Sequence, residues 1–261
     1  MPKRRSKADT SSLADQVSSK RRPCVPKAPG TVQENGTSEG PSHVVSPGSC
    51  SSVELESGFP VIQFQAWLVG SSLIKGAFHQ LCTRPDGINI GLDSVGGSLT
   101  WEFLGGMRIR DIEPTIRYLL SFKNPPEYLL VHCGGNDIGS STSAVIIAEL
   151  KSIFVRLQKL LPNSKLIWSQ ILPRLSWRYV PLVLLAEKAR KRINSAISTY
   201  AIRNGGHYIK YPELSVTNRG YFACDDTHLS PSGYDLMLDT ISEALSSFSR
   251  LNTPVFPIQP S

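Results

Sequence analysis

The stretch YLLVHCGGND, residues 128–137, joins a continuous apolar run to a turn of two glycines and two polar residues. A run such as 128–133 is typical of a strand that is buried on both faces of a parallel sheet. The segment Gly134-Gly135-Asn136-Asp137 follows it directly and has the composition of a loop. This pattern predicts a central parallel strand that ends in a polar loop.

Strand-like runs and amphipathic helices alternate on both sides of this segment. Strands are predicted over residues 63–69, 88–93, 128–133, 165–172 and 208–211. Helices are predicted over residues 72–80, 109–122, 143–161, 181–204 and 232–248. Strands that alternate with helices imply βαβ units and a parallel sheet covered on both sides. The expected fold class is therefore α/β, a three-layer α/β/α sandwich with a five-stranded parallel sheet.

The two ends of the chain differ in composition from the segment between them. Residues 1–57 are rich in Ser, Pro, Gly, Lys and Arg, lack aromatic residues, and are expected to be disordered. Residues 1–30 hold +6 of the net charge of +7, with basic clusters at 3–5 and 20–22. These clusters have two open interpretations, a nuclear-import signal or nucleic-acid contact, and a solvated basic tail. The expected organisation is a basic tail (1–57), one domain (58–250) and a C-terminal tail (251–261).

The cysteine pattern and the hydropathy of the sequence indicate the cellular compartment that we expect for the protein. The five cysteines are an odd number without CxxC or other metal-ligand spacing, and no apolar signal peptide begins the chain. No run approaches 18 apolar residues, so no membrane span is expected. These features predict an intracellular protein, cytoplasmic or nuclear.

Small and polar residues follow the predicted strands. Gly70-Ser71-Ser72 follows the first strand, Gly96-Gly97 the second and Asn136 the third. Because ligands bind beyond the carboxyl ends of parallel strands, these segments are expected to meet at one edge of the sheet. Each residue also has a simpler interpretation, since Ser72 can be a helix cap, and Gly97 and Asn136 can be turn residues.

An Asp-x-x-His pair, Asp225 and His228, lies in the loop that precedes the last predicted helix. The carboxylate can hold one imidazole nitrogen and so leave the other nitrogen free as a general base. Such a pair requires a nucleophile and an oxyanion site, and the strand-end residues are the candidates.

These segments together resemble the sequence blocks of the SGNH/GDSL hydrolase family of esterases and lipases. Gly70-Ser71-Ser72 resembles the family's Gly-Asp-Ser block, and Gly97 its second-block glycine, with Gly96 as a close rival. Residues 134–137 match the family's Gly-x-Asn-Asp, and residues 225–228 match its Asp-x-x-His. The resemblance covers residues 60–248.

The resemblance implies a flavodoxin-like SGNH hydrolase fold and a serine esterase without metal or cofactor. It makes Ser72 the nucleophile, His228 the general base and Asp225 the residue that orients it. The implied oxyanion donors are the Ser72 N–H, the Gly97 N–H and the Asn136 side chain. Substrates would be carboxylic esters, including acetyl esters of lipids, sugars or other small acceptors.

Two departures from the family pattern stand out. Ser71 replaces the family's Asp beside the nucleophile, and Leu229 stands where many members have Pro.

The basic tail and residues 172–174 (Leu-Pro-Arg) also resemble the SGNH-domain proteins of vertebrate tyrosine-recombinase retrotransposons. The alternative function is therefore a weak or inactive SGNH-fold binding or assembly module with a nucleic-acid-binding tail in residues 1–30.

Two other groups of residues have interpretations of their own. His132 lies inside an apolar strand and is interpreted as a packed core histidine. Residues 177–179 (Trp-Arg-Tyr) follow the fourth strand, and they can line a substrate pocket or form an ordinary surface loop.

Overall fold

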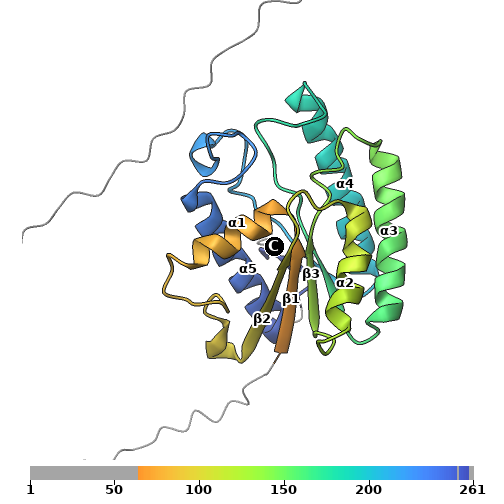
Figure 1. The fold of residues 1–261 in the computed structure, drawn as a ribbon, viewed down its shortest axis with the longest axis vertical. Helices are drawn as coiled ribbons and strands as arrows, with labels where there is room; N and C mark the ends of the chain where they lie inside the picture. The colour runs from red at the N-terminus through yellow and green to blue at the C-terminus, as the bar shows by residue number, and fades with distance from the viewer. Residues whose placement is uncertain (1–63, 252, 259–261) are drawn as a thin grey trace, which may run out of the picture. The chain divides into compact units, whose positions relative to one another are not determined.

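The computed structural model describes residues 64–251 and 253–258. The predictions for the basic tail, residues 1–57, fall outside this range. Figure 1 shows the described residues as a sheet between two layers of helices. The observed fold confirms the expected α/β class with a parallel sheet.

The sheet has six parallel strands in the order β2-β1-β3-β4-β5-β6. Its strands are β1 (Phe64–Gly70), β2 (Gly97–Phe103), β3 (Tyr128–His132), β4 (Lys165–Ser169), β5 (His207–Ile209) and β6 (Val255–Phe256). The first five strands have the 2-1-3-4-5 order of flavodoxin-like sheets. In that order the loops after β1, β2 and β3 lie at neighbouring positions along one edge.

Five α-helices and three short 3₁₀ helices connect the strands. The α-helices are α1 (Ser72–Leu81), α2 (Ile112–Leu120), α3 (Ser143–Leu160), α4 (Val183–Arg203) and α5 (Pro231–Leu251). The 3₁₀ helices are η1 (Leu92–Val95), η2 (Ile109–Asp111) and η3 (Arg219–Tyr221). No helix within residues 64–251 and 253–258 combines the length and apolar character needed to cross a bilayer.

The sheet is buried on both faces, as the apolar run in β3 predicted. Leu68 and Leu130 belong to the core under α1 and α5. Trp67, Leu129 and Val131 belong to the core under α2, α3 and α4. Successive strand residues point to opposite faces, so a strand covered twice must be apolar throughout.

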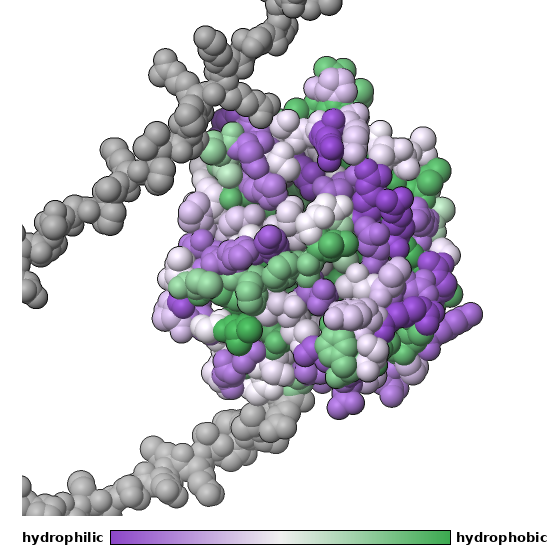
Figure 2. Space-filling model, in the orientation of Figure 1, coloured by the Kyte–Doolittle hydropathy of each residue, from purple (hydrophilic) through white to green (hydrophobic). Residues whose placement is uncertain are grey.

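The outer surface of α2 and α3 carries charged side chains. Figure 2 shows hydrophilic side chains gathered over these two helices. Glu113 of α2 accepts hydrogen bonds from Arg117 on its own helix and from Arg156 of α3. These exposed ion pairs contribute little stability individually, and they mark the solvent side of that layer.

The second strand lies further along the chain than the sequence predicted. Residues 88–93 form a turn and the start of η1, with Ile90 and Gly91 at positive φ (48° and 75°), which an extended strand excludes. The strand is β2 instead, in which Leu99 is buried and Trp101 and Phe103 pack against the core. The prediction at 88–93 was wrong because it used a short apolar alternation that the chain folds into a turn.

The sixth strand occupies part of the predicted C-terminal tail. Tyr208 donates its N–H to Pro254 O at 2.9 Å, and Lys210 donates its N–H to Phe256 O at 2.8 Å. β6 lies between Pro254 and Pro257, and two residues are too few to show a strand period. The sequence therefore predicted five strands where the sheet has six.

Candidate functional site

The junction between β1 and α1 presents Ser72 at the carboxyl edge of the sheet. A Cβ on Gly70 would lie 2.5 Å from Ile74 Cγ1 and 2.6 Å from His132 O, so the approach of β3 and α1 requires glycine here. Ser71 is the N-cap of α1, yet its buried side chain makes no capping bond. Ser72 is the first helical residue and is half-buried, so its hydroxyl faces the loops rather than the core.

Ser72, His228 and Asp225 form one hydrogen-bonded chain. Ser72 Oγ lies 2.8 Å from His228 Nε2, and Asp225 Oδ2 lies 2.5 Å from His228 Nδ1. The second carboxylate oxygen of Asp225 accepts the backbone N–H groups of Thr227 and His228 at 3.0 and 2.9 Å. Asp226 takes φ of +59° between them, which curls the turn around the carboxylate. The structure brings together these three predicted residues, which lie up to 156 positions apart.

Asp225 is held ionised by this turn. Partial burial alone would raise the pKa of Asp225, but the His228 ring and the two backbone N–H donors outweigh burial and lower the pKa to about 2. An ionised Asp225 accepts the proton of His228 Nδ1, which leaves Nε2 as an acceptor for the Ser72 hydroxyl. The arrangement can therefore remove a proton from Ser72 as its oxygen attacks an electrophile.

Asn136 projects from the loop after β3, next to the loop that carries Ser72. The two strands pair in register with Gly70 opposite His132, so their following loops are neighbours. Asn136 Nδ2 donates to Met107 O at 3.0 Å, and its Oδ1 accepts two N–H groups of Arg174 at 3.3 Å each. The amide therefore has a fixed orientation, with one Nδ2 hydrogen left over for a ligand.

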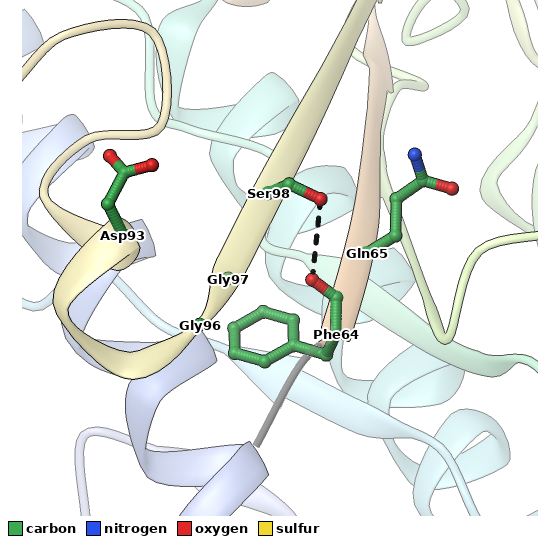
Figure 3. Close-up of a pocket in the computed structure, with 6 residues that line it drawn as sticks. All are labelled: Phe64, Gln65, Asp93, Gly96, Gly97 and Ser98. Carbon is green, nitrogen blue, oxygen red and sulfur yellow. Dashed lines mark hydrogen bonds between the residues drawn. The ribbon is translucent and has the colours of Figure 1, made fainter. Parts of the chain in front are cut away.

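Gly97 is not brought to this edge. It begins β2 opposite Phe64, the first residue of β1, whereas Ser72 follows the last residue of β1. Six strand steps of about 3.3 Å separate the two ends of β1 by about 20 Å. Figure 3 shows the pocket at this far end, lined by Gly96, Gly97, Asp93 and Phe64, without Ser72, Asp225 or His228. The prediction of Gly97 as an oxyanion donor was wrong. The second strand was expected to end just before Gly97, whereas β2 begins at Gly97.

A second glycine pair, Gly105-Gly106, follows the carboxyl end of β2. Leu104 donates its N–H to Gly70 O at 3.1 Å, so this turn lies against the β1–α1 junction. Met107 N–H closes the turn on Leu104 O at 2.9 Å, and Gly106 has φ of +76°, which favours glycine. Neither glycine N–H has an acceptor among the described residues. The sequence signal for this pair was the alternation of Leu99, Trp101 and Phe103 before it.

His132 lies beneath the site and has no access to it. Its Nδ1 lies 2.9 Å from Ser169 Oγ, which lies 2.8 Å from the Tyr211 hydroxyl. Burial, with a smaller effect of the Arg174 charge, lowers the pKa of His132 to about 3, so the ring is neutral at physiological pH. This agrees with its interpretation as a packed core histidine.

No three His, Cys, Asp or Glu side chains gather as they would around a metal ion in the part of the chain that the structure describes. The polar groups at the carboxyl edge are instead a serine hydroxyl bonded to a histidine–aspartate pair and the side-chain amide of Asn136.

Residues 69–236 match the GDSL-like lipase/acylhydrolase family, and the chain belongs to this family. No curated protein sequence matches the chain. The membership confirms the resemblance to SGNH/GDSL hydrolases and makes the protein a hydrolase that acts on esters.

Solved structures show the same fold at low sequence identity. A GDSL-like lipase from Bacteroides thetaiotaomicron VPI-5482 is 18% identical with a TM-score of 0.54, over 70% of this chain and 88% of that chain. The psychrotrophic esterase EstA from Pseudoalteromonas sp. is 14% identical with a TM-score of 0.55, over 73% of this chain and 100% of that chain. A serine-to-alanine mutant of an acetyl esterase with acetate ion is 14% identical with a TM-score of 0.51, over 73% and 100% of the two chains. At these identities the likeness establishes the fold.

Proposed function

We propose that the protein is a serine esterase that cleaves carboxylic esters through an acyl-enzyme intermediate. Ser72 Oγ attacks the ester carbonyl while His228 Nε2 takes its proton. His228 then gives that proton to the leaving alcohol, and a water molecule, activated by the same ring, hydrolyses the acyl-enzyme. Asp225 orients His228 and stabilises the imidazolium. The hydrogen-bonded chain from Ser72 through His228 to Asp225 is the observation that carries this proposal.

The oxyanion that forms during attack requires donors at the carboxyl edge. The free Nδ2 hydrogen of Asn136 and the N–H of Ser72, at the start of α1, are two of them. We assign the third to Gly106 in place of Gly97, because Gly106 lies on the turn bonded to Gly70 and lines one small pocket together with Asn136. Donors fixed before the reaction stabilise developing charge without reorganisation.

Ser71 at the family's Asp position does not interrupt this machinery. Its side chain is buried and makes no capping bond, and none of the hydrogen bonds that link Ser72, His228 and Asp225 involves it. Activation of Ser72 therefore rests on His228 and Asp225 alone.

The part of the substrate that binds beside the oxyanion donors is expected to be small. The pocket beside Asn136 and Gly106 has a volume of about 80 Å³. A volume of this kind of about 10–15 Å³ is enough for one water molecule, so the pocket has room for a small group of several heavy atoms. Acetyl and other short acyl esters fit this volume.

The alternative, an inactive binding or assembly module of a mobile-element protein, would be favoured by a broken hydrogen-bonded chain. The intact chain favours the esterase. The retrotransposon resemblance and the nucleic-acid contact of residues 1–30 stay predictions, and the tail lies outside the described residues.

Labelling with a fluorophosphonate probe tests the proposal on wild-type protein, Ser72→Ala and Ser71→Ala. We expect Ser72→Ala alone to abolish labelling, together with hydrolysis of 4-nitrophenyl acetate. Well-folded wild-type protein that neither labels nor hydrolyses the ester would refute the esterase. Labelling lost only in Ser71→Ala would make Ser71 the nucleophile and overturn the assignment of Ser72.

A further inference from the structure

Three arginines line the small pocket beside the proposed oxyanion site. Arg108 comes from the loop after β2, and Arg174 and Arg178 come from the loop after β4. Asn136 and Gly106 line the same pocket, so a group bound there would lie next to the two residues that are proposed to bind the oxyanion. The 173–180 loop is fixed against the Asp225–His228 turn, because Leu175 and Ser176 both donate their N–H groups to Asp226 O at 2.9 Å.

Arg174 is buried, with 6% of its surface exposed. Its guanidinium lies over the Trp177 ring at 5.2 Å and so close to Gly135 that a Cβ there would lie 2.7 Å from Nη2. Its two Nη groups contact Asn136 Oδ1, and its buried Nε has no hydrogen-bond partner among the described residues. A guanidinium has five N–H donors, so Arg174 has donors to spare in a place that water enters poorly.

Arg108 and Arg178 bring two further positive charges to the pocket around one aromatic ring. Arg108 Nη2 donates to the Tyr179 hydroxyl at 3.0 Å. The guanidinium carbons of Arg108 and Arg178 lie 5.6 and 5.5 Å from the centre of the Tyr179 ring. The ring orients both cations without neutralising either.

No carboxylate within residues 64–251 and 253–258 makes an ion pair with any of these three arginines. Three acids lie nearby, and each is engaged by other groups. Asp225, whose negative charge acts on Arg174, is bonded to the ring and the backbone N–H of His228. Asp111 accepts the N–H of Arg108 at 2.8 Å, and Asp137 accepts the N–H of Ile109 at 3.2 Å. Burying a cation without a counter-charge is unfavourable, and a converging set of cations in a pocket favours an anionic ligand.

We propose that Arg108, Arg174 and Arg178 form a subsite for an anionic group on the ester substrate. This inference rests on the proposed esterase function and adds the substrate class, an ester that carries a carboxylate. A carboxylate fits the volume of the pocket and the fork of donors that a guanidinium presents. The anion can belong to the acyl group, as in a half-ester of a dicarboxylic acid, or to the alcohol, as in an acetylated hydroxy acid.

Matched pairs of esters distinguish these two sources. For the acyl side we would compare kcat/KM on 4-nitrophenyl hemiglutarate with that on 4-nitrophenyl pentanoate, a neutral ester of the same acyl chain length. For the alcohol side we would compare 4-acetoxybenzoate with phenyl acetate. Wild-type protein is expected to prefer the anionic member of one pair by about tenfold or more, the typical effect of one charge-assisted hydrogen bond.

The Arg108→Gln, Arg178→Gln double variant is expected to reduce that preference at least fivefold. Arg110→Gln is the matched control, because Arg110 lies two residues from Arg108, is 73% exposed, and contacts Asp111 outside the pocket. This variant removes a positive charge that lies outside the pocket, and it is expected to keep the wild-type preference. A loss of preference that is equal in Arg110→Gln would mean a general charge effect and would overturn the subsite.

A binding measurement separates this proposal from the esterase itself. Calorimetric titration of Ser72→Ala protein with monomethyl glutarate and with 4-hydroxybenzoate reports on the subsite without turnover. Binding that the arginine double variant abolishes supports the subsite even if no ester is hydrolysed. Hydrolysis of neutral esters without any preference for an anion, and without binding of either compound, would overturn the subsite and leave the esterase standing.

Discussion

The Asp225→Asn substitution changes one atom at the centre of the hydrogen-bonded chain. The amide oxygen of the new side chain could still accept the backbone N–H groups of Thr227 and His228, as Asp225 Oδ1 does at 3.0 and 2.9 Å. The amide nitrogen would occupy the place of Oδ2, 2.5 Å from His228 Nδ1. That nitrogen is a donor only, so His228 Nδ1 would have to accept, and the ring proton would move to Nε2.

The consequence at Ser72 is a reversal of the hydrogen bond. An Nε2 that carries a proton cannot accept the hydroxyl proton of Ser72 across their 2.8 Å contact. The corresponding change in a serine protease triad lowers kcat by about 10⁴ while the geometry stays intact. We expect a loss of about 10³–10⁴ in kcat here, with KM changed much less.

Asp226→Asn is the matched control. Asp226 is the adjacent carboxylate, pairs with the exposed Arg219 at 3.2 Å, and has a positive φ that asparagine tolerates well. We would measure 4-nitrophenyl acetate hydrolysis and fluorophosphonate labelling for both variants, and thermal unfolding to show that both are folded. Equal, small effects of the two substitutions on kcat would refute the assigned role of Asp225.

Three other predictions follow from the structure. Asn136→Ala is expected to lower kcat by about 10²–10³ with little change in KM, because one oxyanion donor is lost; steady-state kinetics measures this. Leu130→Ala, in the fully buried β3, is expected to lower the free energy of unfolding by about 2–5 kcal/mol, whereas Leu184→Ala, at a 69% exposed residue, should change it by less than about 0.5 kcal/mol; urea unfolding measures both. Burial raises the pKa of Asp137 to about 6, above its unfolded value of about 3.9, so the stability that protonated Asp137 contributes is present below pH 4 and lost as pH rises to about 6. Asp137→Asn should therefore gain stability relative to wild type over that interval in urea titrations at several pH values.

Each of these predictions has a contrary outcome. A KM effect of Asn136→Ala without a kcat effect would make Asn136 a substrate contact instead of an oxyanion donor. Equal losses of stability for Leu130→Ala and Leu184→Ala would contradict the assigned core. A difference between Asp137→Asn and wild type that does not change with pH would contradict the raised pKa of Asp137.

The residues that sequence analysis predicted well are those whose pattern is local. The β3 strand and its loop are contiguous in the sequence, and the unbroken apolar run of the strand predicts its burial on both faces. Asp225 and His228 lie three positions apart in one turn, so their spacing alone indicated the hydrogen bond that the structure contains.

The errors concern which end of a strand a residue occupies. Gly97 is the first residue of β2 and Gly106 lies in the turn after β2, and only the register of β2 against β1 places one glycine at each end of the strands. That register is set by burial of Leu99 and by pairing with a strand 33 residues earlier, which no local pattern reveals. The contact of Arg174 with Asn136 spans 38 residues and is equally non-local.

The two-residue strand β6 has a consequence for self-association. The outer strand of a sheet offers unpaired backbone groups to any other chain. β6 covers β5 at this edge and is only two residues long, and Pro254 and Pro257 beside it have no backbone N–H to donate. A further strand therefore finds few free backbone groups to pair with at the β6 edge of the sheet. Removing residues 252–261 would expose β5 as the edge strand, and the enzyme would be expected to aggregate through strand pairing before its hydrolytic site is disturbed.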